Sequence, residues 1–173
     1  MSKVIYLNEH NRQQKEPIRN VRLRDQVNLV KCILYFAQRT TQRLYKTKLN
    51  KLLFYAQFLY YKKYGDILLN YKFIKDYHGP VIENLDDHLD FFAEAKLIKL
   101  KSTNYGTVIL PGIKLKNSAY EEKEKEILKK VLDKFDMYTA AEISDYSHKE
   151  DLWLYTELKE EIDIERAIEL HEF

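Results

Sequence analysis

The sequence predicts a mainly α-helical (α+β) fold, a compact helical domain built around one buried central helix with one small β-hairpin. Residues 48–64 form the most apolar run in the chain, and this run is too regular to be a loop. Amphipathic segments with helical spacing precede and follow it, whereas residues 97–110 alternate between apolar and polar side chains. Helical spacing in most segments and strand-like alternation in one therefore indicate this fold class.

The central segment is apolar on two sides of the predicted helix. Its polar residues Lys51 and Gln57 must therefore reach the surface or find buried partners, because a helix that is apolar on two faces has to be surrounded. Thr47 is predicted to cap the start of this helix, and Gly65 closes its end. Two stripes share the helical spacing, one of Leu49, Leu52, Leu53, Ala56 and Tyr60 and one of Phe54, Tyr55, Phe58 and Tyr61.

The residues before the central helix divide into an arm and a helix. Residues 1–23 have no sustained periodicity and are predicted to form an N-terminal arm. A helix should begin near Asp25, which can cap it, and it should end or bend in the polar stretch that starts at residue 38. Cys32 lies inside this helix, where we expect it to pack. Residues 24–173 are predicted to form a single domain, since the chain length suits one core.

Strand and turn signals follow the central helix. Residues 71–77 (YKFIKDY) alternate well enough for a short strand, and the His-Gly-Pro sequence after them predicts a turn. Residues 81–95 have the spacing of a helix with acidic residues in its first turns, as the helix dipole favours. Residues 97–110 predict the β-hairpin, with its turn at residues 103–106.

The C-terminal third is predicted to be helical. Ser118 should cap a charged amphipathic helix that ends near Phe135. Thr139 and Glu142 have the spacing of a capping box at the start of a short helix. Residues 147–153 are expected to form a loop or a helix end, and a last helix should span residues 163–170.

Composition and charge limit the class of protein. The single cysteine excludes an intramolecular disulfide, and no stretch has the length of a membrane-spanning helix or the pattern of a signal peptide. We therefore expect a cytoplasmic protein without a membrane partner. Residues 1–80 hold 16 Lys and Arg against 5 Asp and Glu, a net charge of +11, whereas residues 81–173 hold 13 against 22, a net charge of −9. The two halves should attract each other, and the basic half offers a surface to nucleic acid or to an acidic protein.

Residue patterns for catalysis or cofactor binding are weak. The chain has 4 glycines without a phosphate-binding loop, and one cysteine cannot form a zinc-binding pair. A metal site would have to be assembled in space from His78, His88 and carboxylates, which no ligand spacing supports. Ser147 and His148 are adjacent and point in different directions, which disfavours a serine hydrolase. We therefore expect no catalytic residues, no metal and no cofactor, and a protein that is not an enzyme.

Three motifs, in order along the chain, carry a resemblance to a known family. They are residues 48–57 (KLNKLLFYAQ), residues 77–81 (YHGPV), and residues 147–150 (SHKE) followed by Trp153. At these spacings the chain resembles the Panacea domain, or SocA-like antitoxin family, over roughly residues 26–170. The resemblance implies a non-catalytic helical domain with a small β-hairpin that neutralises a cognate toxin by binding it directly, in bacteria and their phages. The matching positions are Lys48, Leu49, Lys51, Leu52, Tyr55, Gln57, Tyr77, His78, Gly79, Pro80, Val81, Ser147, His148, Glu150 and Trp153.

These positions can define the fold or contact the partner. Apolar and turn positions usually serve packing, so we expect most of them to define the fold. Lys51, Tyr55 and Gln57 could supply polar contacts beneath the turn at residues 78–80. His148 could cap a helix end or hydrogen-bond to the central helix, with Trp153 packed over it.

The predicted function is that of an antitoxin-like protein in a bacterial or phage toxin–antitoxin system, with a cognate toxin as its partner. Three alternatives stay open: a nucleic-acid-binding phage or prophage regulator that uses the basic half, a phage inhibitor of a host defence protein, and an enzyme with a cleft of His and carboxylates. Self-association into a homo-oligomer is a further option. Exposed Tyr and Arg side chains dominate interface energetics, so the candidate anchors, if exposed, are Arg43, Tyr60, Tyr61, Tyr64 and Tyr71.

Overall fold

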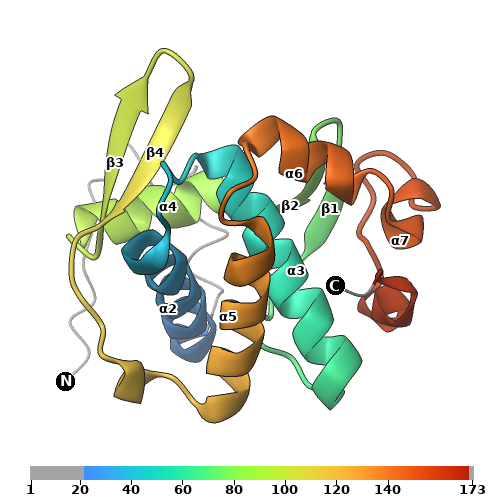
Figure 1. Ribbon diagram of the computed structural model, residues 1–173, viewed down its shortest axis with the longest axis horizontal. Helices are drawn as coiled ribbons and strands as arrows, with labels where there is room; N and C mark the ends of the chain where they lie inside the picture. Colours follow the sequence, from blue (N-terminus) through green and yellow to red (C-terminus); the bar gives the residue numbers. More distant parts are fainter. Residues whose placement is uncertain (1–21, 172–173) are drawn as a thin grey trace.

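The computed structural model describes residues 22–171, and its elements confirm the predicted class, mainly α with a smaller β component (Figure 1). Residues 1–21 of the predicted N-terminal arm lie outside the described residues. The helices are α2 (Leu23–Arg39), α3 (Lys46–Tyr64), α4 (Leu85–Glu94), α5 (Glu122–Phe135), α6 (Ala140–Ser147) and α7 (Asp151–Leu154), with the 3₁₀ helices η2 (Asn117–Ala119) and η3 (Ile164–Glu169). The strands are β1 (Phe73–Asp76), β2 (Gly79–Ile82), β3 (Ile98–Thr103) and β4 (Gly106–Pro111).

Helix α3 lies in the middle of the molecule, as predicted. Every residue from Lys48 to Tyr60 is buried, and helices α2, α5 and α6, the 3₁₀ helix η3 and strand β2 pack around it (Figure 1). The rings of Phe54 and Phe58 pack within this core with their centroids 4.5 Å apart. Enclosing the helix removes its apolar surface from water, which is the dominant favourable contribution to folding. None of the helices within residues 22–171 is both long and apolar enough to cross a membrane.

The start of α3 differs from the prediction. The helix begins at Lys46 and Tyr45 occupies the N-cap, so Thr47 lies inside the first turn and does not cap it. The backbone of Tyr45 pairs with Val108 of β4, which keeps this residue extended and fixes where the helix starts. At the other end, Gly65 adopts the left-handed conformation, with a φ of 62°, that closes many helices.

Helix α2 also starts earlier than predicted. Arg22 occupies its N-cap, and Asp25 lies in the first turn, where its charge suits the helix dipole without capping. Cys32 is 2% exposed, and burial raises the pKa of its thiol. A buried thiol of this kind packs as a small apolar residue, as the sequence predicts.

Helices α5 and α6 are capped by reciprocal hydrogen bonds. Ser118 lies in η2 and does not cap α5; Glu121 is the N-cap, and its N–H donates to Oε2 of Glu124 at 2.9 Å. The Ser118 prediction is therefore wrong. The predicted capping box of α6 is confirmed, because the N–H of Glu142 donates to Oγ1 of Thr139 at 3.1 Å.

The sequence predicts one hairpin, and the described residues contain two. Strands β1 and β2 pair antiparallel, with residues 73–76 opposite residues 79–82. The chain continues as a strand to Ile82 instead of entering a helix at residue 81, because the buried Asn50 of α3 accepts the N–H of Ile82 at 3.1 Å. Helix α4 therefore begins only at Leu85.

The predicted hairpin is confirmed as β3 and β4, which pair in register from Ile98 with Pro111 to Thr103 with Gly106. Strand β4 is also tied to the loop between α2 and α3, since the N–H of Ile109 donates to the backbone oxygen of Leu44 at 2.8 Å. This contact holds the hairpin against the start of α3.

The C-terminal segment returns to the first hairpin. Ile74 of β1 forms a bridge with Glu161, and the N–H of Ile162 donates to the backbone oxygen of Phe73 at 2.8 Å. The predicted last helix is present but is the 3₁₀ helix η3, with Asp163 as its N-cap. Residues 147–153 form the end of α6 and the short α7.

Candidate functional site: a buried polar cluster beneath the first hairpin

Polar side chains from several elements meet beneath the turn between β1 and β2. Lys51 comes from the middle of α3 and is fully buried, and its ammonium donates to the backbone oxygen of Pro80 at 3.1 Å. Burial lowers the pKa of Lys51 to about 7, although the nearby Asp76 favours the charged form. The prediction that Lys51 contacts this turn from below is confirmed.

Gly79 makes the close approach of these elements possible. Its φ of 103° is rarely adopted by residues with a side chain, and a Cβ there would lie 2.5 Å from Cε of Lys51 and 2.6 Å from Oγ of Ser147. Ser147 is itself fully buried, and its hydroxyl donates to the backbone oxygen of Ser144 at 2.7 Å. Helices α3 and α6 and strand β2 therefore meet here without room for a side chain at residue 79.

A buried carboxylate connects α3 to the C-terminal end. Glu150 is fully buried; its Oε1 accepts the hydroxyl of Tyr55 at 3.0 Å and its Oε2 accepts the N–H of His171 at 3.0 Å. Nδ1 of His171 lies 3.4 Å from the same Oε2. Burial raises the pKa of Tyr55, so its hydroxyl stays protonated and able to donate. The carboxylate is thus satisfied by groups that are far apart in the sequence.

An aromatic stack covers the cluster. The rings of His148 and Trp153 are nearly parallel, at 15°, with centroids 4.2 Å apart, and the ammonium of Lys75 lies 4.3 Å from the centroid of the Trp153 ring. The predicted packing of Trp153 over His148 is therefore confirmed, and His148 is the C-cap residue of α6. Burial, with Lys51 nearby, lowers the pKa of His148 and favours the neutral imidazole. Nε2 of His148 and Nε1 of Trp153 are buried without a hydrogen-bond partner among the described residues.

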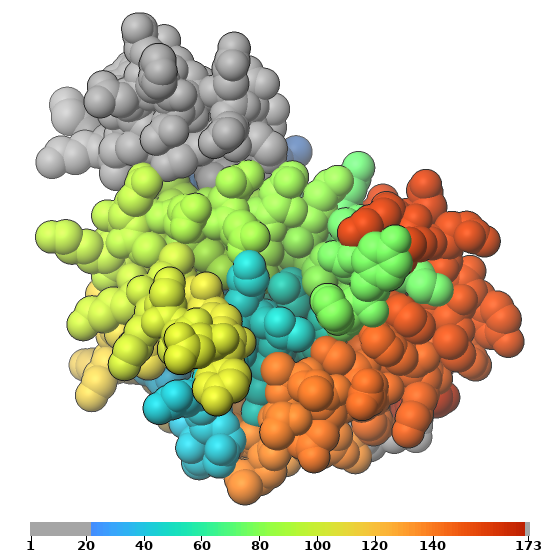
Figure 2. All heavy atoms as spheres, turned by 90° about the horizontal axis from the view of Figure 1, so that it is seen from above, coloured from blue at the N-terminus to red at the C-terminus, as the bar shows by residue number. Residues whose placement is uncertain are grey.

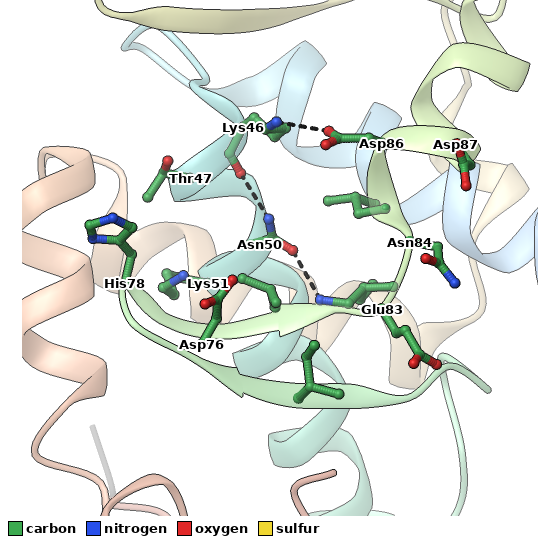
Figure 3. Close-up of a pocket in the computed structure, with 14 residues that line it drawn as sticks. Lys46, Thr47, Asn50, Lys51, Asp76, His78, Glu83, Asn84, Asp86 and Asp87 are labelled. Atoms are coloured by element: carbon green, nitrogen blue, oxygen red, sulfur yellow. Dashed lines mark hydrogen bonds and ion pairs between the residues drawn. The ribbon is translucent and has the colours of Figure 1, made fainter. Parts of the chain in front are cut away.

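A hollow of about 500 Å³ opens beside this cluster, between the start of α3, the first hairpin and the start of α4 (Figure 3). Figure 3 shows the ion pair of Lys46 with Asp86, which joins the start of α3 to the start of α4 at 2.8 Å, and it shows Lys51 and His78 at the turn end of the first hairpin. Four carboxylates line the hollow: Asp76, Glu83, Asp86 and Asp87. The ion pair of Asp76 with Lys159 lowers the pKa of that carboxyl.

The residues of this cluster lie in a part of the chain that matches a known protein family. The family model described as "Antitoxin SocA-like, Panacea domain" matches residues 49–154. The chain belongs to this family. Neither a curated protein nor a solved structure matches the sequence. The matched range of the Panacea domain holds the buried lysine, the glycine turn and the aromatic stack.

Several motif residues of the Panacea domain lie outside the cluster. Lys48 is buried, but its ammonium donates to the backbone oxygen of Asp136 at 2.6 Å, at the end of α5. Oε1 of Gln57 accepts the N–H groups of Leu68 and Leu69, at 3.0 and 2.6 Å, so Gln57 anchors the loop after α3. The contacts found are thus to the loop after α3 for Gln57 and to Glu150 for Tyr55, whereas the sequence suggested the turn at residues 78–80 for both. Three further positions are half-buried or in the core, namely Val81, Leu49 and Leu52, and Tyr77 is 68% exposed.

The candidate anchors differ in accessibility. Arg43 is exposed, whereas Tyr60 is 5% exposed and does not meet the condition set for an anchor. The half-buried Tyr61 and Tyr64 donate their hydroxyls to carboxylates of the second half of the chain. Tyr71 is half-buried in contact with α4, and its hydroxyl has no partner in the described part of the protein.

Sequence reasoning did not assign two residues that hold the site together. Asn50 ties α3 to β2, and the signal available was its polar amide in a mostly apolar segment. His171 carried no such signal, since its contact with Glu150 depends on the path of the C-terminal segment. Within residues 22–171, no group of three His, Cys, Asp or Glu is placed to hold a metal ion.

Proposed function

We propose that this Panacea-domain protein is an antitoxin that binds a toxin protein directly and so neutralises it, acting in the cytoplasm as a binding protein and not as an enzyme. The observation that carries the proposal is the match to an antitoxin family over residues 49–154. The burial of Lys51, Tyr55 and Glu150 supports a scaffold role for the polar cluster beneath the first hairpin. With such a scaffold, we expect the residues that bind the toxin and determine specificity to lie on the exposed loops.

The charge distribution supports a protein partner over nucleic acid. Ion pairs join lysines of the basic first half to carboxylates of the acidic second half, so part of the positive charge is already neutralised within the molecule. Phosphates attract a protein through unpaired Lys and Arg, which these contacts reduce. These pairs include Lys31 with Glu124, Lys46 with Asp86, and Lys63 with Glu126, and the pair of Asp76 with Lys159 also joins the two halves.

Co-expression with the product of the neighbouring small open reading frame tests the proposal. That product alone should stop bacterial growth, and this chain should restore growth and co-purify with it. Growth arrest that persists, together with no co-purification, would contradict the proposed function. An empty vector is the control for the burden of expressing a second protein.

A further inference from the structure

A second hollow, which we call the tyrosine hollow, lies on the other side of the first turn of α3. It has a volume of about 520 Å³, within the usual range of binding pockets. Its walls come from the loop between α2 and α3, the β3–β4 turn and the connection between α5 and α6. Figure 2 shows these segments, coloured cyan, yellow and orange, on one face of the molecule. Its lining includes Arg43, Tyr45, Lys48, Tyr105 and Met137.

The tyrosine hollow exposes apolar side chains on ordered backbone. Tyr105 is 86% exposed and Met137 is 74% exposed, and tyrosine and methionine are enriched in protein interfaces. The turn that carries Tyr105 is held by two hydrogen bonds: the N–H of Tyr105 donates to Oγ1 of Thr103 at 3.1 Å, and this hydroxyl donates to the backbone oxygen of Gly106 at 2.8 Å. Because the backbone of this turn is already fixed, little backbone conformational entropy is lost when a partner binds Tyr105.

The charge of the tyrosine hollow is positive. Arg43 and Lys48 line it, and no carboxylate does. Lys48 donates to a backbone oxygen, and no carboxylate within the described range forms an ion pair with Arg43. Helix α3 also begins here without a side-chain cap and without an acidic residue in its first turn. Because the ammonium of Lys48 is buried at the end of α5, an anionic group in this hollow would interact favourably with the exposed Arg43 and with the helix dipole.

We propose that the tyrosine hollow docks a segment of the toxin in which an acidic side chain lies next to apolar ones. The carboxylate would pair with Arg43, and the apolar neighbours would pack on Tyr105 and Met137. This inference rests on the proposed function and names the surface and the chemistry of its partner.

A single carboxylate fits this surface better than a nucleic acid does. Asp136 precedes Met137, and the carboxylate of Glu142 accepts the N–H of Thr139, which lines the hollow. A chain of phosphates that entered the hollow would meet these two negative charges, whereas one acidic side chain can pair with Arg43 alone. A protein segment is therefore the occupant that the charges favour.

Selection of random linear peptides displayed on phage against the full chain tests this inference without the toxin. Selected peptides should combine Asp or Glu with aromatic or aliphatic neighbours. A synthetic peptide of the selected sequence should bind at least about tenfold more weakly to Arg43→Glu and to Tyr105→Ala than to the original chain, as expected for interface anchors. No enrichment, or enrichment of basic peptides, would overturn the proposal.

Matched variants separate the hollow from general effects of charge and aromatic loss. Lys114→Glu makes the same charge change at an exposed position that does not line the hollow, and Tyr155→Ala removes a tyrosine that is 74% exposed just after α7 and also lies outside the hollow. Both should bind the peptide as the original chain does. Equal loss in all four variants would overturn the proposal, as would a single-stranded oligonucleotide that binds in an Arg43-dependent way and displaces the peptide.

The co-expression assay distinguishes this inference from the proposed function. If the original chain rescues growth and Arg43→Glu and Tyr105→Ala rescue equally well, the hollow is not the toxin-binding surface and the antitoxin function stands. If the original chain does not rescue growth, the antitoxin function fails, and peptide selection alone decides whether the hollow docks acidic segments.

Discussion

At the scale of single residues, Gly79 determines whether the buried cluster can form. An added methyl group would meet Lys51 and Ser147 at distances well below van der Waals contact, and the φ of 103° disfavours any residue with a side chain. We expect Gly79→Ala to lower the free energy of unfolding by roughly 2–5 kcal/mol, the sum of overpacking and backbone strain. Urea denaturation at neutral pH measures this loss.

Gly65→Ala is the matched control for this effect. Gly65 also has a positive φ, 62°, but nothing lies within 4 Å of a Cβ built there. Only the left-handed backbone should then cost free energy, about 1–2 kcal/mol. Equal losses in the two variants would show that backbone strain alone, and not the contact with Lys51 and Ser147, explains the glycine.

At the scale of elements, helix α5 begins at a different residue in the structure than the sequence predicts, after Glu121 instead of after Ser118. Glu124 closes the capping box and also pairs with Lys31 at 3.0 Å, whereas Ser118 lies in η2. Glu124→Ala should therefore lower the free energy of unfolding by about 1–2 kcal/mol, and Ser118→Ala should change it by less than about 0.5 kcal/mol. Thermal or urea unfolding of both variants checks the assignment.

Glu124→Gln separates the two roles of this side chain. Glutamine can complete a capping box but cannot form the ion pair, so its loss should be smaller than that of alanine. If Ser118→Ala proved the more destabilising change, the start of α5 given by the structure would be contradicted.

The sequence predicts elements well where local signals agree. The buried α3, the β3–β4 hairpin and the Thr139 capping box follow from spacing and turn residues alone. The first hairpin was missed because the residues after the turn could be read as helix, and the deciding contact, from Asn50 to Ile82, joins residues that are distant in sequence. Motif residues pointed to the buried cluster, whereas nothing local indicated that Glu150 binds His171.

At the scale of the whole molecule, buried titratable groups make stability depend on pH in two directions. Burial lowers the pKa of Lys51 to about 7 from 10.5 and lowers the pKa values of His88 and His148 as well. Between the folded and unfolded pKa values of each group, the unfolded chain binds more protons than the folded chain, so stability rises with pH. Burial raises the pKa values of Cys32 and Tyr55, so the folded chain keeps protons that the unfolded chain loses, and stability falls in alkaline solution.

Stability should therefore rise from mildly acidic pH to about pH 8.5, level off near pH 9, where the Cys32 thiol of the unfolded chain ionises, and fall above about pH 10, where its tyrosines ionise as well. Above neutral pH, Lys51 is the main source of the rise, at up to about 1.4 kcal/mol per pH unit. Urea denaturation at a series of pH values measures the profile.

Lys51→Met tests the cause of this rise, because it removes the titrating group. The rise in stability between about pH 7 and 8.5 should then flatten. The lost hydrogen bond to Pro80 should lower stability at every pH. The measurement to compare is the slope of unfolding free energy against pH, because Lys48, Cys32 and the tyrosines titrate alike in both proteins. A slope that persisted in Lys51→Met would rule out Lys51 as its cause.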